Sequence, residues 1–126
     1  MKMLWGKDFE LSDTVLEKAC SIELLLLDVD GVLTDGCIRL TESGEEIKVF
    51  NALDGHGIKM LQASGIDVAI ITARNSPAVA HRMEELGVKH FYQGQKDKRV
   101  AFSGLLKKLG IKASQAAFVG DDVIDL

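Results

Sequence analysis

Three short runs of apolar residues constrain the fold of this chain more than any other feature of its sequence. They are Leu24 to Leu27, Val68 to Ile71 and Ala116 to Val119, and polar residues bound each of them. Apolar runs of this length without alternation are typical of strands buried on both faces, as in a parallel sheet. The stretches between the runs are long enough for the crossover connections that parallel strands require.

The intervening stretches carry helical patterns with recognisable ends. Ser76 and Pro77 are typical of a helix start. Gly65, Gly87 and Gly110 stand where three helices should end, because glycine readily takes the left-handed conformation found there. We expect helices at about residues 12–20, after Asp54, from Pro77 and before Gly110, and a further strand at residues 90–92. The sequence therefore predicts a doubly wound, Rossmann-like α/β sheet.

One segment interrupts the alternation of strands and helices. Residues 37–40 and 47–50 are two short stretches joined by a polar turn at Ser43-Gly44, which is typical of a β-hairpin. We expect this hairpin to be an insertion, at about residues 36–51, between the first strand and the first crossover helix. Residues 1–126 contain no internal repeat or linker, so we expect a single domain without a separate cap domain.

The composition excludes several classes of protein. With 47% hydrophobic and 27% charged residues, the chain is neither disordered nor collagen-like. Its net charge of -4 argues against sequence-independent binding of nucleic acid. The apolar runs are far shorter than the roughly 20 residues of a membrane helix, so we expect no membrane span or secretion signal. We expect Cys20 and Cys37 to be reduced thiols, as in a cytoplasmic protein.

Polar residues follow each apolar run, at the point where a parallel strand would end. Asp28 and Asp30 follow the first run, Thr72 follows the second, and Asp121 and Asp125 follow the third. These ends meet at one edge of an open α/β sheet, where ligands bind. A single aspartate there is as often a cap or turn former, but four beside apolar strands would repel one another unless a cation lay among them. A hard divalent cation with oxygen ligands would compensate these charges, and Mg²⁺ is favoured because it binds through one or two carboxylates, keeps several waters and can bridge to a phosphate. The sequence therefore predicts a magnesium site.

Four parts of the chain, in this order, resemble the signatures of the haloacid dehalogenase-type (HAD) phosphatases: residues 28–36, Thr72, Lys98 and residues 120–125. Over about residues 23–126 the chain is most similar to the branch of 3-deoxy-D-manno-octulosonate 8-phosphate (KDO 8-phosphate) phosphatases. The closer likeness rests on five short stretches: Gly44-Glu45-Glu46, Phe50-Asn51, Asp54-Gly55, Ile70-Ile71-Thr72-Ala73-Arg74 and Tyr92-Gln93-Gly94. The resemblance implies release of KDO and phosphate for lipopolysaccharide synthesis. Phosphatases for other nonulosonic acid phosphates, such as 9-phosphates, share most of these residues.

The resemblance also implies a chemical role for each matching residue. Asp28 would attack phosphorus to form an aspartyl-phosphate, and Asp30 would protonate the leaving sugar oxygen and then activate water. Thr72 would donate a hydrogen bond to a phosphoryl oxygen, and Lys98 would supply positive charge. Without the family order, Lys98 would be read as part of a solvated basic helix start. The implied magnesium ligands are Asp28, the backbone carbonyl of Asp30, Asp121 and Asp125, and the role of Asp122 is left open.

A set of substrate-binding residues is implied in the same way. They are Asp30, Asn51, Ala52, Leu53, Asp54, Gly55, Lys59, Arg74, Arg82 and Lys98. Arg74 stands two residues past Thr72, where its guanidinium can bind a phosphate or carboxylate bidentately. Lys59 and Arg82 fit equally well as exposed helix charges. If an arginine is usual at position 59, Lys59 lacks the planar fork that suits a carboxylate.

A small hairpin cannot cover a sugar phosphate alone. The resembled branch forms tetramers whose subunits cover one another's sites, so we expect a homo-oligomer with residues 37–51 at its contacts. The chain ends one residue after Asp125, earlier than the family pattern, and both a fragment and a truncated chain fit this. Two other classes stay open: a receiver domain with a phosphorylatable aspartate, and a non-catalytic module that keeps the fold for assembly.

Overall fold

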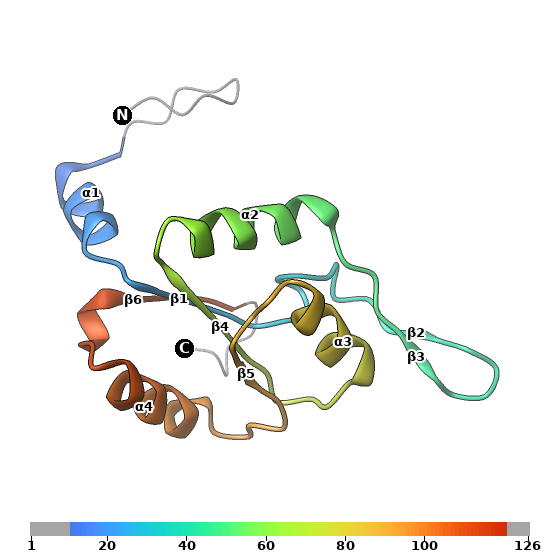
Figure 1. Cartoon of the computed structure of the whole chain (residues 1–126). Helices are drawn as coiled ribbons and strands as arrows, with labels where there is room; N and C mark the ends of the chain where they lie inside the picture. The colour runs from blue at the N-terminus through green and yellow to red at the C-terminus, as the bar shows by residue number, and fades with distance from the viewer. Residues whose placement is uncertain (1–10, 121–126) are drawn as a thin grey trace.

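A parallel sheet of strands forms the centre of this computed structural model, which describes residues 11–120 (Figure 1). The order of its strands is β5-β4-β1-β6. The bounds are β1 (Leu24–Leu27), β4 (Asp67–Ile71), β5 (His90–Tyr92) and β6 (Ala116–Val119). After β1 the chain adds β4 and β5 on one side, and then returns to place β6 on the other side of β1. The strand order therefore reverses beside β1, as expected for a doubly wound sheet.

Helices cover both faces of this sheet (Figure 1). The described helices are α1 (Asp13–Cys20), which precedes the sheet and buries none of its residues, α2 (Ala52–Ala63), α3 (Pro77–Glu85) and α4 (Lys98–Leu109), followed by the short 3₁₀ helix η1 (Ala113–Gln115). Helices α2 and α3 pack on one face and α4 packs on the other. Within the described residues, no helix is long and apolar enough to cross a bilayer.

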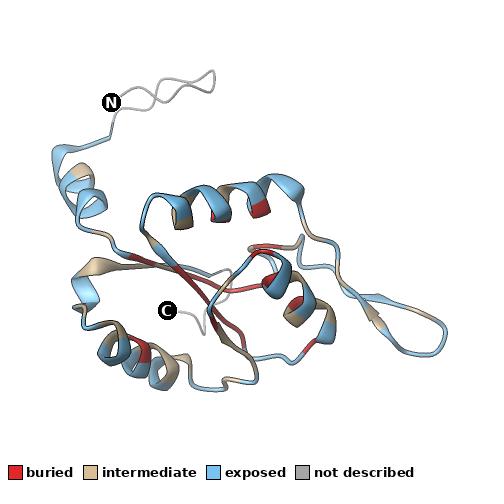
Figure 2. Ribbon diagram, in the orientation of Figure 1, coloured by how far each residue is buried: buried red, intermediate tan, exposed pale blue. Residues whose placement is uncertain are grey.

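The leucine run of β1 supplies apolar side chains to both faces. Leu24 and Leu26 belong to the same buried cluster as Leu105 of α4. Leu27 belongs to the opposite cluster, together with Met83 of α3. Figure 2 shows the resulting burial along the central strands. Because both faces are covered, no position of β1 can be polar, which explains the absence of alternation in the sequence.

The helix ends follow local signals in the sequence. Ser76 caps α3 by accepting a hydrogen bond from the backbone N–H of Val79, and Pro77 is the first helical residue. Helix α2 begins earlier than predicted, at Ala52 rather than after Asp54, because the Asn51 side chain caps it. The predicted glycine stops are confirmed by left-handed φ angles of 92°, 68° and 67° at Gly65, Gly87 and Gly110.

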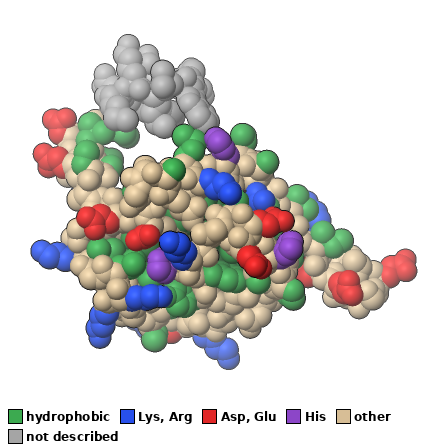
Figure 3. Space-filling model, viewed as in Figure 1, with side chains coloured by type: hydrophobic (Ala, Val, Ile, Leu, Met, Phe, Trp, Pro, Cys, Tyr) green, Lys and Arg blue, Asp and Glu red, His purple; other side chains and the backbone are tan. Residues whose placement is uncertain are grey.

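The inserted hairpin is confirmed, although its strands are shorter than the sequence suggested. Strands β2 (Arg39–Leu40) and β3 (Glu46–Ile47) are antiparallel, with Leu40 opposite Glu46. Gly44 takes a left-handed φ of 86° in the turn between them. Figure 3 shows the hairpin projecting beyond the body, with acidic side chains at its outer end. Between β1 and α2 the chain thus carries this hairpin in place of a cap domain.

Candidate active site

The predicted catalytic residues lie at the carboxyl ends of the two central strands. Asp28 directly follows β1 and Thr72 directly follows β4, and the pairing of Leu27 with Ile70 brings these two strand ends to the same edge. Both side chains are buried, with exposed fractions of 7% for Asp28 and 4% for Thr72. The Lys98 ammonium lies 3.3 Å from Asp28 Oδ1. A buried carboxylate with an adjacent cation is suited to hold and attack a phosphoryl group.

Lys98 is distinguished from its basic neighbours by where its side chain goes. Its side chain is 15% exposed and lies over the ring of Phe118, with Nζ 5.8 Å from the ring centroid. Arg99 is 89% exposed and pairs with the helix cap Asp97 at 3.0 Å, and Lys96 is exposed. The reading of a solvated basic helix start therefore holds for Lys96 and Arg99, whereas Lys98 turns inward to Asp28.

The loop after Asp28 is closed by hydrogen bonds that fix Asp30. Gly31 has a left-handed φ of 80°, and its backbone N–H donates to Thr34 Oγ1 at 3.2 Å. The N–H of Gly36 donates to the same hydroxyl at 3.2 Å. Val29, which lies between the two aspartates in the sequence, is fully buried in the core. Gly31 thus allows the sharp turn after Asp30, and the Thr34 hydroxyl ties the loop together.

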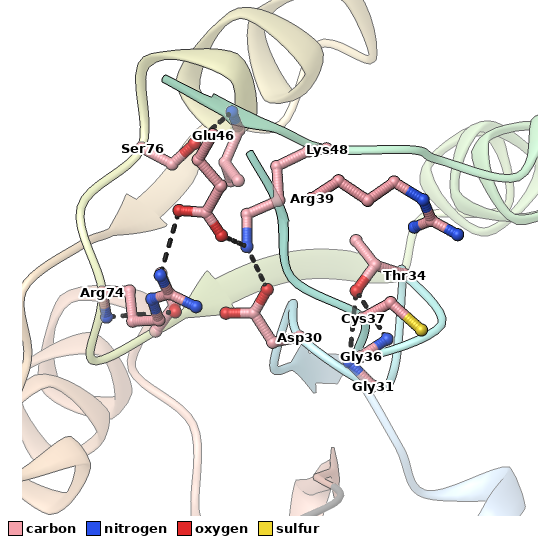
Figure 4. Close-up of polar contacts among 12 residues, drawn as sticks. Asp30, Gly31, Thr34, Gly36, Cys37, Arg39, Glu46, Lys48, Arg74 and Ser76 are labelled. Atoms are coloured by element: carbon pink, nitrogen blue, oxygen red, sulfur yellow. Dashed lines mark hydrogen bonds and ion pairs between the residues drawn. The ribbon is translucent and has the colours of Figure 1, made fainter. Parts of the chain in front are cut away.

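The hairpin brings two further charged residues to Asp30 (Figure 4). The Lys48 ammonium lies 2.5 Å from Asp30 Oδ1 and 2.7 Å from Glu46 Oε1, between the two carboxylates. Arg74 reaches the other oxygen of Glu46, with Nη2 3.0 Å from Oε2. The Lys48 side chain is only 3% exposed. Burial opposes its charge, but the hydrogen bonds to Asp30 and Glu46 outweigh this and raise the pKa of Lys48.

Sequence reasoning did not assign a role to Lys48 or Glu46. Both lie in the stretch that follows Gly44, and residues two apart on a strand face the same way. That spacing was the available signal. It could not show that this face turns toward Asp30, which precedes Lys48 by 18 residues.

The predicted substrate-binding residues divide into two groups. Asn51 caps α2 and residues 52–55 form its first turn, and Arg82 of α3 lies so close that a side chain at Gly55 would displace the guanidinium. Arg74 is joined to the hairpin through Glu46. Lys59 is exposed on α2, so the structure agrees with the reading of an exposed helix charge for Lys59 and not for Arg82, whose side chain is 26% exposed.

The described residues supply part of the predicted metal site. Asp28 and Asp30 offer carboxylate and carbonyl oxygens at the sheet edge, and these are the donors that Mg²⁺ prefers. Asp121, Asp122 and Asp125 lie outside the described residues. From residue 11 to residue 120, no three His, Cys, Asp or Glu side chains are placed to hold a metal ion together. The donor chemistry present fits magnesium, and the full ligand set stays a prediction.

A cavity of about 660 Å³ opens beside the site, between α4 and the sheet. Apolar residues such as Leu26, Phe102 and Phe118 line one part of it, and the charged residues at the start of α4, Lys96, Asp97, Lys98 and Arg99, line another. The apolar part of the wall does not suit a sugar acid phosphate. The polar ligand is better matched by the charged groups around Asp28, Asp30 and Arg74.

Relatives of known sequence resemble this chain closely. The KDO 8-phosphate phosphatase KdsC of Escherichia coli K12 is 52% identical over 115 residues, which are 91% of this chain and 61% of that protein. KdsC of Yersinia pestis is 49% identical, with 91% of this chain and 62% of that protein covered. The chain thus spans somewhat over three-fifths of the length of the curated relatives it matches.

Solved structures share its fold. A crystal structure of the Yersinia pestis phosphatase superposes with a TM-score of 0.92 and 46% identity, over 99% of this chain and 66% of that chain. The phosphatase of Moraxella catarrhalis, in complex with magnesium ion, phosphate ion and KDO, gives 0.87 and 48%, over 90% and 66%. A family model for haloacid dehalogenase-like hydrolases matches residues 38–126. The chain belongs to the haloacid dehalogenase-like hydrolase family.

Proposed function

We propose that residues 1–126 form one phosphatase domain that hydrolyses KDO 8-phosphate to KDO and phosphate with the help of magnesium. The observation that carries the proposal is the buried Asp28 at the end of β1, with the Lys98 ammonium 3.3 Å away. The 52% identity to a KDO 8-phosphate phosphatase also supports the proposal. A receiver domain is a weaker fit, because here Asp28 and Asp30 share one loop and both have a cationic partner.

In the proposed reaction Asp28 is the nucleophile. One of its carboxylate oxygens attacks phosphorus, the bond from phosphorus to the sugar oxygen breaks, and Asp30 gives that oxygen its proton. Asp30 then takes a proton from water, which attacks the aspartyl-phosphate and releases phosphate and the free Asp28 carboxylate. Lys98 and the Thr72 hydroxyl stabilise the charge that builds on the phosphoryl oxygens.

Magnesium would add positive charge against the phosphoryl oxygens and the nucleophile. We propose that Asp28, the backbone carbonyl of Asp30, Asp121 and Asp125 hold it. The choice of magnesium is supported by the crystal structure of the Moraxella catarrhalis relative, which is in complex with a magnesium ion.

The sugar acid is proposed to lie between the start of α2 and the edge of the sheet. Arg74 and Arg82 would bind its two anionic groups, since arginine pairs bidentately with both phosphate and carboxylate. The half-exposed guanidinium of Arg74, with 48% of its side chain accessible, is available to a ligand. The remaining proposed contacts are Asn51, Ala52, Leu53, Asp54, Gly55 and Lys59.

We propose a homotetramer in which hairpins cover neighbouring sites. Exposed apolar side chains on and beside the hairpin support this arrangement. They are Ile38, Leu40, Ile47, Val49 and Leu53, with exposed fractions from 48% to 75%. Such a concentration of apolar surface is typical of a contact between proteins. Cys20 and Cys37 are free and exposed, which favours the reducing cytoplasm as its compartment.

A panel of phosphate esters tests the proposal. KDO 8-phosphate, a nine-carbon sugar acid 9-phosphate and glucose 6-phosphate are offered with magnesium and with excess chelator, and phosphate release is measured. We expect the highest kcat/KM for KDO 8-phosphate and no turnover in chelator. A higher kcat/KM for the 9-phosphate would show that the chain acts on a nine-carbon sugar acid by the same reaction, and would contradict the assignment of KDO 8-phosphate. Equal rates on the neutral sugar phosphate, or undiminished rates in chelator, would contradict the proposal.

A further inference from the structure

Lys48 is a buried cation in an otherwise exposed hairpin. Its side chain is 3% exposed, whereas that of Arg39 on the adjoining strand is 43% exposed. Arg39 pairs with Asp35 near the base of the hairpin, at 2.8 Å in a solvated setting. Lys48 instead enters the site and meets Asp30. One hairpin thus carries two cations in opposite environments.

Stability alone is a poor explanation for such a buried charge. Removing an ammonium from water costs about as much as the ion pairs return, so a buried pair is weak evidence for stabilisation. A two-stranded hairpin is also marginal by itself. The partner of Lys48 is therefore informative, because Lys48 contacts Asp30, the residue proposed to transfer the proton.

The contact with Lys48 uses one of the two oxygens of the Asp30 carboxylate. Lys48 engages Oδ1, while Oδ2 accepts no hydrogen bond from residues 11–120. Figure 4 shows Oδ2 directed away from the ammonium. When one oxygen of a carboxyl group is held by a partner, the direction of the other oxygen is fixed. Proton transfer depends on that direction.

We infer that Lys48 is a positioning residue for Asp30, and that Glu46 aligns Lys48 and Arg74 together. Glu46 forms an ion pair with Lys48 through Oε1 and accepts a hydrogen bond from Arg74 through Oε2, so one hairpin carboxylate joins the partner of Asp30 to the proposed anion-binding arginine. The inference rests on the proposed function, because it gives Asp30 its role from there. It adds that the hairpin acts within its own subunit's site.

The test uses the dependence of rate on the leaving group. Kcat/KM reports only the steps up to formation of the aspartyl-phosphate, and a sugar alkoxide needs a proton to leave whereas p-nitrophenolate does not. General acid catalysis contributes about a hundredfold or more, so Lys48→Met should lower kcat/KM for the sugar phosphate at least about tenfold. The loss for p-nitrophenyl phosphate should stay within about threefold.

Two controls separate positioning from folding. Lys48→Arg keeps the charge and should recover part of the loss on the sugar phosphate. Arg39→Met removes the exposed cation of the same hairpin and should leave both substrates unchanged. Glu46→Gln, which keeps the shape of the side chain, should shift the ratio of the two substrates in the same direction as Lys48→Met, by about threefold.

The outcomes distinguish this inference from the function on which it rests. If the unaltered chain hydrolyses neither ester, the proposed function is wrong and the inference is wrong with it. If the unaltered chain hydrolyses both, and Lys48→Met and Glu46→Gln lower both rates equally or not at all, Lys48 serves the fold only. That result would overturn the inference and leave the proposed function standing.

Discussion

The sheet edge and the hairpin supply charged groups to the same site by different physical means. At the edge, Asp28 and Thr72 are placed by strands whose apolar side chains are buried on both faces. In the hairpin, two-residue strands have little core of their own, and Glu46 and Lys48 are placed by ion pairs with residues of the body. One region is positioned by packing and the other by charge.

Substitutions in these two regions should therefore have different consequences. Packing is insensitive to the chemistry at the strand ends, so catalytic substitutions at the edge should leave the fold intact. Ion pairs place the hairpin through the same groups that would act on the substrate. Substitutions there should alter position and reactivity together.

The largest expected effect follows from Asp28→Asn. The amide is close in shape to the carboxylate but is a far weaker nucleophile, so phosphatase turnover should fall by at least about a thousandfold. The thermal unfolding midpoint should change little, because the surrounding core stays packed. Retention of most activity would show that Asp28 is not the nucleophile, and loss of the folded state would break the proposed separation of packing from chemistry.

Arg74→Met should have a smaller and more selective effect. Each charge-assisted hydrogen bond contributes about 1.5–3 kcal/mol, so kcat/KM for KDO 8-phosphate should drop roughly tenfold to a hundredfold. A neutral sugar phosphate, with one anionic group fewer, should lose less. The two kcat/KM values are compared in the same preparation, and equal losses would mean that Arg74 does not bind the carboxylate of the sugar acid.

The sequence predicted most of the sheet and its helices because their signals are local. Apolar runs, caps such as Ser76 and stops such as Gly110 act within a few residues, and each predicted element was confirmed. The early start of α2 was missed because Asn51 was not recognised as a cap. The shortness of the hairpin strands was missed because their apolar residues face outward rather than into a core.

The site was predictable only where strand ends define it. Asp28, Thr72 and Lys98 follow from strand order and the resembled motifs, and the structure brings Asp28 and Lys98 together. The roles of Glu46 and Lys48 depend on how the hairpin docks, which is a long-range electrostatic arrangement. A pattern of alternating residues states which side chains share a face, but not what that face meets.

A matched pair of leucine substitutions compares the two regions in stability. Leu26 of β1 is 2% exposed and Leu40 of the hairpin is 63% exposed. Leu26→Ala should lower the free energy of unfolding by about 2–5 kcal/mol through the cavity it leaves. Leu40→Ala should change the free energy of unfolding of the monomer by less than about 0.5 kcal/mol. Denaturant unfolding measures both, and light scattering on Leu40→Ala tests whether the oligomer weakens instead.

The smallest expected effect concerns the buried histidine of the sheet. Burial lowers the pKa of His90, and the nearby Lys108 and Lys89 act in the same direction against the opposing charge of Asp67. A lowered pKa in the folded state means that the unfolded chain binds the proton more tightly, so His90 costs stability as the pH falls below about 6.5. The free energy of unfolding should therefore decrease from pH 7 to pH 5, and His90→Gln should remove part of that slope. The change should be smaller than that of Leu26→Ala, and an identical slope in His90→Gln would show that packing in β5 does not depend on a neutral imidazole.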